Sequence, residues 1–171
     1  MKKDVREVIK DEEPHLNNLL TQEDQSLVIV LSALDIDSDL LTYQIVQNPI
    51  NGTVEITENI VTYNPINNFN GLDSFIFGVS DGEFLSENII TITIEGVNDA
   101  PDIAEISDLI ISEDTQLTYD VIASDVDGDD LEYSSTSTSN EVITWFTGST
   151  LNVLPDEDWF GSSVITVIVN D

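Results

Sequence analysis

The chain of 171 residues contains no cysteine. This absence excludes disulfides, thiol catalysis and cysteine-based zinc sites. Histidine occurs once, at His15, so the chain has too few histidine and cysteine ligands for a typical zinc site and does not contain the residues of a histidine-based catalytic triad. No apolar run approaches the roughly 18 residues of a membrane span, so we expect no direct membrane insertion. Stability is therefore expected from core packing and from metal held by oxygen ligands.

Basic residues are almost as scarce, with 4 Lys and Arg against 34 Asp and Glu and a formal net charge of −30. All four bases lie in the first ten residues: Lys2, Lys3, Arg6 and Lys10. Phosphate backbones and anionic membranes require positive charge, so both are excluded as partners. Lysine is also absent from every predicted strand, which excludes isopeptide cross-links. Such a charge opposes a compact state unless cations neutralise it.

The second half of the chain repeats the first with an offset of 90 residues. Glu23 and Asp24 match Glu113 and Asp114, and the acidic run Asp35–Asp39 matches Asp125–Asp129. The matches continue without gaps to the end of the chain. Such a register indicates a tandem duplication.

Each copy is predicted to consist of short strands separated by turn signals such as Asn51-Gly52 and Asn70-Gly71. The strands predicted in the first copy are Leu27–Ala33, Thr42–Val46, Gly52–Ile56, Ile60–Tyr63, Ser74–Val79 and Ile89–Ile94. No segment has helical periodicity. About seven strands per 90 residues is the size of an antiparallel β-sandwich. The predicted fold is all-β: two tandem sandwiches, the second without its last strand, because nothing matches Gly82–Val97.

We therefore divide the chain into an N-terminal segment or remnant of a preceding linker (1–14), a first repeat (15–97), a calcium-binding linker (98–102) and an incomplete second repeat (103–171). Met1-Lys2-Lys3 resembles the head of a signal peptide, but charged residues follow where an apolar stretch should be. The chain is expected to be either non-secreted or a fragment of a longer exported protein, and we favour the fragment.

The acidic loops are the strongest candidate sites. Asp35, Asp37 and Asp39 alternate with other residues, as do Asp125, Asp127 and Asp129. Hard oxygen ligands at this density suit Ca²⁺, which takes six to eight of them. The alternative is a solvated acidic turn, since Asp and Gly are common turn residues. The loops are not EF-hands, because the twelfth position is Val46 or Thr136 instead of a bidentate Glu.

The chain contains four longer motifs: Asp-x-Asp-Gly-Asp-x-Leu-x-Tyr, Asn-Pro-x-x-Asn-Phe-Asn-Gly-x-Asp-Ser-Phe, Val-Ser-Asp-Gly and Val-Asn-Asp-Ala-Pro. In these motifs the chain resembles bacterial cadherin-like tandem repeats, which occur in surface adhesins and secreted multi-domain proteins. The resemblance implies Ig-like sandwiches joined end to end, with Ca²⁺ and neighbouring repeats as partners, outside the cell or on its surface. The chain departs from the pattern at Ser38, where Gly is usual, and at Ser163, which stands opposite Asp73.

The strand order of that family also implies a ligand set. Asp81 and Asp171 would join the acidic loop of their own repeat. One junction would collect Glu23, Asp73, Asn98, Asp99, Asp125, Asp127 and Asp171 around one or two calcium ions. Alternatives remain open: Glu23 as an exposed strand-end acid, Asp73 as part of a hydrogen-bonded turn, and Asp81 and Asp171 as residues before glycine turns.

The predicted function is a non-enzymatic, calcium-binding structural and adhesion module. One alternative is a carbohydrate-binding module, which would need an exposed aromatic platform at Trp159 or Tyr63. Another is an assembly subunit whose incomplete second sandwich accepts a strand from a second copy. For that case we predict that Asp4–Lys10 adds to the edge at Val164–Val169.

Overall fold

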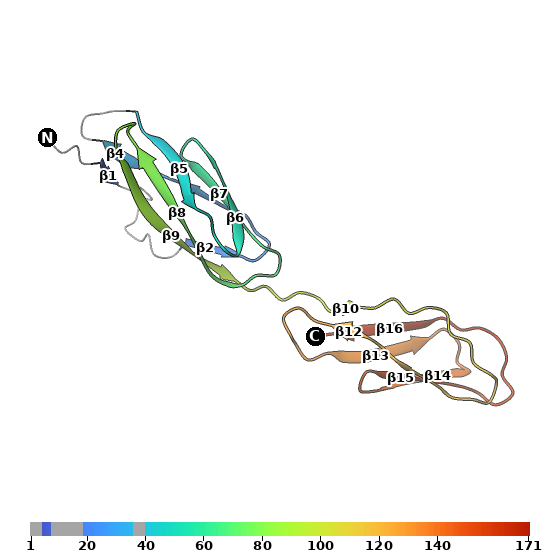
Figure 1. The fold of residues 1–171 in the computed structure, drawn as a ribbon. Helices are drawn as coiled ribbons and strands as arrows, with labels where there is room; N and C mark the ends of the chain where they lie inside the picture. The colour runs from blue at the N-terminus through green and yellow to red at the C-terminus, as the bar shows by residue number, and fades with distance from the viewer. Residues whose placement is uncertain (1–4, 8–18, 36–39) are drawn as a thin grey trace. The chain divides into compact units, whose positions relative to one another are not determined.

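The computed structural model describes residues 5–7, 19–35 and 40–171, and in these ranges it contains strands, turns and loops but no helix. The chain divides into two compact units, Met1–Val97 and Asn98–Asp171, most of whose strands are labelled in Figure 1. The prediction of an all-β fold with two tandem sandwiches is confirmed. Within the ranges described, no helix is long and apolar enough to span a membrane.

The first unit is built from two sheets and one short pair of strands. One sheet has the order β2-β9-β8-β5 and the other β3-β7-β6, while β1 pairs with β4. β2 runs parallel to β9, and the other pairings of this unit are antiparallel. The strands are β1 (Val5–Glu7), β2 (Leu19–Gln22), β3 (Leu27–Val30), β4 (Ala33–Asp35), β5 (Thr42–Gln47), β6 (Gly52–Thr57), β7 (Ile60–Pro65), β8 (Gly71–Ser80) and β9 (Leu85–Glu95).

The core of the first unit lies between these two sheets. Side chains alternate between the faces of a strand, so Phe75, Phe77 and Val79 of β8 share one face and are each 1% exposed. Three isoleucines of β9 cover the adjacent part of the core: Ile90, Ile92 and Ile94. The opposite sheet contributes Val61 and Tyr63 of β7. The period-2 pattern of the sequence therefore places the core correctly.

The second unit repeats most of this arrangement. Its sheets have the orders β11-β15-β14 and β13-β16, and β10 pairs with β12. All of these pairings are antiparallel. The strands are β10 (Asp102–Ile103), β11 (Leu117–Asp120), β12 (Ala123–Ser124), β13 (Glu132–Ser137), β14 (Val142–Thr147), β15 (Thr150–Pro155) and β16 (Ile165–Asn170).

The duplication is also visible in the backbone. Asp24 and its counterpart Asp114 both have a positive φ, of 58° and 59°. Each carboxylate accepts a hydrogen bond from a backbone N–H 44 residues further on, that of Asn68 at 3.2 Å and that of Asp158 at 2.8 Å. Asn68 and Asp158 are themselves left-handed. The two copies therefore share the same turn conformation and the same side-chain-to-backbone hydrogen bond at corresponding positions.

The units differ at one sheet edge. Among residues 98–171 no strand corresponds to β9 or to β2. β8 begins at Gly71 because β9 pairs with all of it, whereas β16 begins at Ile165, the counterpart of Phe75. Ile165 and Val167 are only partly buried. The predicted absence of a last strand from the second sandwich is thus seen directly.

Two sequence-based details need correction. We predicted that Asp4–Lys10 adds to Val164–Val169 of a second copy, but the part of this segment that the structure describes, Val5–Glu7, pairs antiparallel with β4 of its own unit. The single strand predicted over Leu27–Ala33 is two strands, β3 and β4, interrupted at Leu31 and Ser32. The interruption lets the chain leave the sheet of β3 and pair β4 with β1.

Candidate metal site

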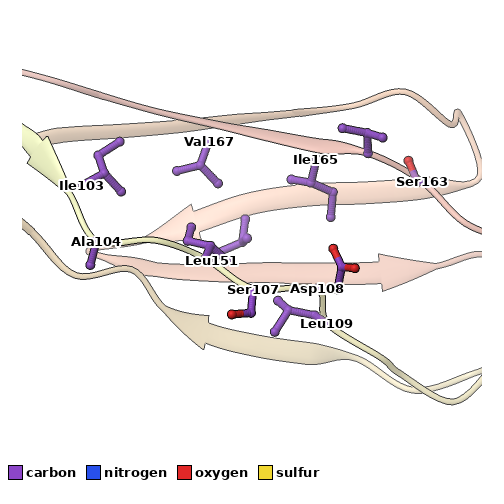
Figure 2. Close-up of a pocket in the computed structure, with 11 residues that line it drawn as sticks. Ile103, Ala104, Ser107, Asp108, Leu109, Leu151, Ser163, Ile165 and Val167 are labelled. Atoms are coloured by element: carbon purple, nitrogen blue, oxygen red, sulfur yellow. The ribbon is translucent and has the colours of Figure 1, made fainter.

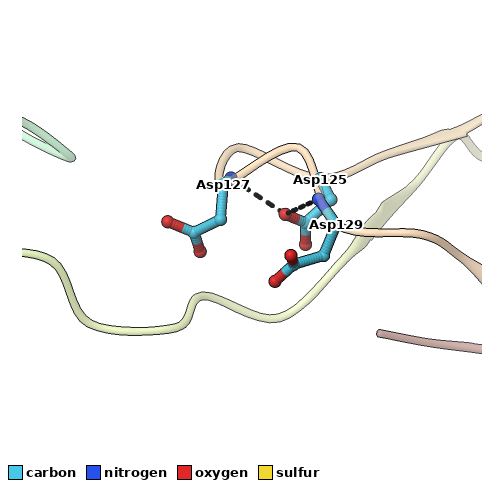
Figure 3. Close-up of side chains that lie close together, drawn as sticks. All are labelled: Asp125, Asp127 and Asp129. Carbon is cyan, nitrogen blue, oxygen red and sulfur yellow. Dashed lines mark hydrogen bonds between the residues drawn. The ribbon is translucent and has the colours of Figure 1, made fainter.

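The loop Asp125–Asp129 follows β12 and is folded around one carboxylate. Oδ1 of Asp125 accepts hydrogen bonds from the backbone N–H groups of Asp127 at 2.8 Å, Gly128 at 3.0 Å and Asp129 at 3.3 Å. Figure 3 shows the bonds to Asp127 and Asp129. Gly128 has a φ of 80°, a conformation that side chains with a Cβ rarely adopt. The turn therefore gathers the three carboxylates.

One carboxylate oxygen of this loop lacks a hydrogen-bond partner. Oxygen atoms of Asp125, Asp127 and Asp129 lie within 4.8 Å of one another. Oδ2 of Asp125 is buried and has no hydrogen-bond partner among the residues that the structure describes. A buried, unpaired carboxylate oxygen is costly, and each such atom calls for an explanation such as a bound ion.

The residues that open the second unit are tied to this loop. The backbone N–H of Asp99 donates to Oδ2 of Asp127 at 2.8 Å. The amide of Asn98 donates to the carboxylate of Asp171, which directly follows β16. Hydrogen bonds and short oxygen–oxygen distances therefore link six predicted ligands of the second unit: Asn98, Asp99, Asp125, Asp127, Asp129 and Asp171.

Glu23 belongs to the first unit and directly follows β2. It is 3% exposed, and its backbone N–H donates to the carbonyl of Glu95 at 2.9 Å. Oε1 accepts a hydrogen bond from the backbone N–H of Val97, whereas the buried Oε2 has no hydrogen-bond partner in the described ranges. Glu23 is thus not an exposed strand-end acid. Its counterpart Glu113 is exposed.

Asp73 is used inside the first sandwich. It is 6% exposed, and its two oxygens accept four hydrogen bonds, from the backbone N–H groups of Ile50, Asn51 and Ser74 and from the hydroxyl of Tyr63 at 2.9 Å. Burial and the neighbouring Asp73 carboxylate raise the pKa of Tyr63 well above its usual value. Asp73 lies in β8 instead of a turn. Its oxygens are satisfied by the protein, so we leave it out of the proposed site.

The remaining predicted ligands belong to the acidic loop of the first unit. Asp35 is the last residue of β4 and is half-buried. Oδ1 of Asp81 accepts hydrogen bonds from the backbone N–H groups of Glu83 and Phe84, at 2.8 and 2.7 Å, as expected before a glycine turn. Asp37 and Asp39 lie outside the described residues. A metal site at this loop stays a prediction.

Neither of the two aromatic side chains that we predicted as the platform of a carbohydrate-binding module, Tyr63 and Trp159, is exposed. Tyr63 is completely buried. Trp159 packs against the core of the second unit. Trp145 is 39% exposed on β14, a single ring without an aromatic neighbour on its face among the described residues.

The chemistry of the donor set favours calcium. Every candidate ligand is a carboxylate or amide oxygen, and Ca²⁺ prefers such hard oxygen ligands. Zn²⁺ sites are built mainly from cysteine and histidine, and the second unit contains neither. The cluster also lies in a region without any Lys or Arg that could neutralise it. The residues present therefore fit a calcium ion.

Comparison with protein families decides the classification. The sequence profile described as "Bacterial Ig domain" matches residues 11–95 and again residues 98–171. The chain belongs to the bacterial Ig domain family. Its two matched segments agree with the two compact units and with the resemblance to bacterial cadherin-like repeats.

Solved structures with a similar fold include cadherin ectodomains. Human protocadherin-24 EC1-2 is 18% identical with a TM-score of 0.58, over 91% of this chain and 79% of that one. Drosophila N-cadherin EC1-4 is 17% identical with a TM-score of 0.48, over 89% and 46%. The chain spans 27% of an endo-fucoidan hydrolase of glycoside hydrolase family 107, which is 19% identical over 89% of this chain with a TM-score of 0.43. The comparison with curated proteins gives no match.

Proposed function

We propose that the chain is a non-enzymatic, calcium-binding module of an extracellular or cell-surface protein, in which Ca²⁺ stiffens the connection between tandem Ig domains. The observation that carries the proposal is the buried, unpaired Oδ2 of Asp125 within a cluster of three carboxylates. A cation bound there would be the missing partner of that oxygen and would offset the repulsion within the cluster.

The connection between the domains is held at both of its ends. In the first unit, Glu23 binds the backbone N–H of Val97. In the second unit, Asp127 binds the backbone N–H of Asp99. Only Asn98 lies between these two residues. A cation that fixes Asp127 would therefore also fix the start of the second domain, which supports a stiffening role.

The affinity needed for this role is modest. Extracellular calcium modules bind with dissociation constants of about 10⁻⁴ to 10⁻³ M. A cation that binds only the ordered arrangement stabilises it by RT ln(1 + [L]/Kd), so millimolar calcium is sufficient. Without metal, we expect the clustered carboxylates to repel one another and the connection to act as a hinge.

Calcium binding is tested by isothermal titration of the whole chain, with Asp125→Asn as the variant and Glu157→Gln as the control. Both changes remove one negative charge from the second unit, but Glu157 is exposed and distant in sequence from the loop. We expect calcium affinity to fall at least tenfold in Asp125→Asn and to change little in the control. Equal effects of the two changes would mean that calcium is attracted by the overall negative charge and is not bound specifically by the Asp125 loop.

Stiffening needs a separate measurement. The cysteine-free chain allows spin labels at Glu55→Cys on β6 and Ile143→Cys on β14, two exposed positions in different units. We expect calcium to narrow the distribution of distances between the labels, and Asp125→Asn to prevent this narrowing. If calcium binds but the distribution of distances does not narrow, calcium stabilises the second domain and does not stiffen the connection.

A further inference from the structure

The edge strand β14 of the second unit carries no charged residue. β14 ends the sheet β11-β15-β14 and has the sequence Val-Ile-Thr-Trp-Phe-Thr. In the stretch from Ser134 to Pro155, Glu141 is the only charged residue, although the whole chain has 34 Asp and Glu. Soluble proteins usually protect an exposed sheet edge with charges, prolines or bulges. β14 has none of these.

The backbone of β14 is free to pair along one side. The N–H of Asp156 donates to the carbonyl of Glu141 at 2.7 Å, and hydrogen-bonded pairs alternate along an antiparallel ladder. Every second residue of β14 therefore bonds to β15. The residues between them turn their N–H and C=O groups to the other side, where no strand pairs with them in the described part of the chain: Val142, Thr144 and Phe146.

Three apolar side chains lie on the outer face of the sheet beside this edge. Ile143 is 54% exposed and Trp145 is 39% exposed, and Leu154 of β15, opposite Ile143, is 37% exposed. The first unit has polar residues at the corresponding positions: Thr53, Glu55 and Asn64. Its strand β6, the counterpart of β14, is also an edge strand. The edge therefore belongs to the fold itself, and only the second copy makes it apolar.

We propose that two copies of the chain associate through this edge, with β14 of one copy pairing antiparallel with β14 of the other. Copies with a net charge of −30 repel one another, so they meet most readily where carboxylates are few. The stretch around β14 is such a place. The contact uses the same surface on both copies and therefore closes at a dimer. It does not depend on the calcium site.

The register follows from the edge-facing residues. When Thr144 lies opposite Thr144 of the second copy, all three edge-facing residues of each strand are paired. Ile143 then lies opposite Trp145 of the other copy on the outer face. This pair of a β-branched and an aromatic side chain forms twice in the dimer, and such cross-strand pairs stabilise a sheet.

Self-association is measured by sedimentation equilibrium of the whole chain in chelator and high salt, which removes calcium and screens the repulsion between copies. We expect a monomer–dimer equilibrium. Trp145→Glu introduces the residue that the first unit has at this position. It should raise the dissociation constant at least tenfold, because it removes the aromatic pair and places a carboxylate on each side of the joined edge. Trp159 remains as a fluorescent probe that the second unit is folded.

The matched control is Val164→Glu. Val164 is 67% exposed and lines the pocket shown in Figure 2, which contains no residue of β14. Both variants replace an exposed apolar side chain of the second unit by a carboxylate, so they change the net charge equally. The dissociation constant should change little in Val164→Glu. An equal loss in the two variants, or a monomer at every concentration, would overturn the proposal.

Hydrogen exchange tests the pairing without a mutation. The amides of Thr144 and Phe146 face the free edge, whereas those of Ile143 and Trp145 bond to β15. We expect exchange at Thr144 and Phe146 to slow as protein concentration rises, and exchange at the other two to change little. Concentration-dependent protection that leaves Thr144 and Phe146 unaffected would mean that another surface joins the copies, and the proposal would be wrong.

Disulfide formation tests the register. Opposite residues of a hydrogen-bonded antiparallel pair have Cα atoms about 5.5 Å apart, within reach of a disulfide. In this cysteine-free chain, Thr144→Cys should form disulfide-linked dimers several-fold faster than Thr147→Cys, which would lie opposite Glu141 of the second copy. Equal rates would show that the strands do not pair around Thr144, and the proposed dimer would be refuted.

Discussion

Replacing Asp73 by asparagine should destabilise the first domain strongly and leave the second unchanged. The side chain keeps its size but exchanges one acceptor oxygen for an NH₂ group. In one orientation of the amide, Ile50 N and Ser74 N face its NH₂ group; in the other only Asn51 N does, because the Tyr63 hydroxyl can turn and accept from the NH₂ group. A buried N–H left unsatisfied costs about 1–3 kcal/mol. The bonds that remain lose the strength that an ionised acceptor adds, about 1–3 kcal/mol together, so the expected loss is roughly 2–6 kcal/mol.

That loss is a large part of the stability of a small domain, which is typically 5–15 kcal/mol. With a urea dependence of about 2 kcal/mol per molar, the midpoint of unfolding of the first domain should fall by roughly 1–3 M. Glu55→Gln is the matched control, since Glu55 is an exposed carboxylate on β6 of the same unit.

The two domains can be followed separately in one sample. Both tryptophans, Trp145 and Trp159, belong to the second unit, so tryptophan fluorescence reports on that unit alone. Far-ultraviolet circular dichroism reports on both. In Asp73→Asn we expect an early circular dichroism transition and an unchanged fluorescence transition. A mutant whose first transition stays within about 0.5 M of the wild type would refute the reasoning, because four hydrogen bonds to a buried carboxylate would then contribute almost nothing.

Three further predictions concern pH, metal and the loop backbone. The pKa of Tyr63 is raised by burial and by Asp73, so its contribution to stability is complete below pH 10, the ordinary tyrosine pKa, and is lost as pH rises towards the folded value. Tyr63→Phe should flatten this alkaline loss in urea titrations. Removing calcium from a sample held at a calcium concentration of about 100 Kd should lower the unfolding free energy of the second domain by about 2.7 kcal/mol and its fluorescence-detected Tm by roughly 10–20 °C. Sodium chloride should restore only part of this loss, because sodium ions screen the carboxylates without coordinating them as calcium does. In Gly128→Ala the added Cβ would meet no neighbouring atom within 4 Å, so the only cost is the backbone strain of a φ of 80°. A strain of about 1–2 kcal/mol should weaken calcium binding roughly 5- to 30-fold. Unchanged affinity in titration calorimetry would show that the loop is not preformed.

Much of the fold follows from the sequence, because the decisive signals are local. Alternation of apolar residues identifies β5 to β9, and the 90-residue register extends the assignment to the second copy. β2 was missed. It has only four residues, and its partner β9 lies about 70 residues further along the chain, so nothing near Leu19–Gln22 indicates the pairing.

The candidate site was predictable to a similar degree. Spacing alone identified the acidic loop, and the resemblance added Asn98, Asp99 and Asp171. The burial of Glu23 could not be read from its neighbours, since it depends on a backbone N–H 74 residues away. The role of Asp73 did have a signal: it lies two residues before Phe75 on an alternating strand, so it shares the buried face.

The two domains solve the same packing problem with different sets of residues. In the first, the Tyr63 ring lies so close to Gly52 that an added Cβ would be 2.5 Å from it, and its hydroxyl binds Asp73. At the three corresponding positions the second domain has Val142, Val153 and Ser163.

All three positions differ together because each depends on the others. Without the tyrosine ring there is room for a side chain at position 142. Without its hydroxyl, a carboxylate at position 163 would lose one of its donors. Ser163 instead forms hydrogen bonds with the hydroxyl of Ser137 at 2.8 Å and the backbone N–H of Ser139 at 3.1 Å. The carboxylate of the first domain is therefore part of a core arrangement, whereas the acidic loops, whose spacing both copies keep, carry the candidate metal chemistry.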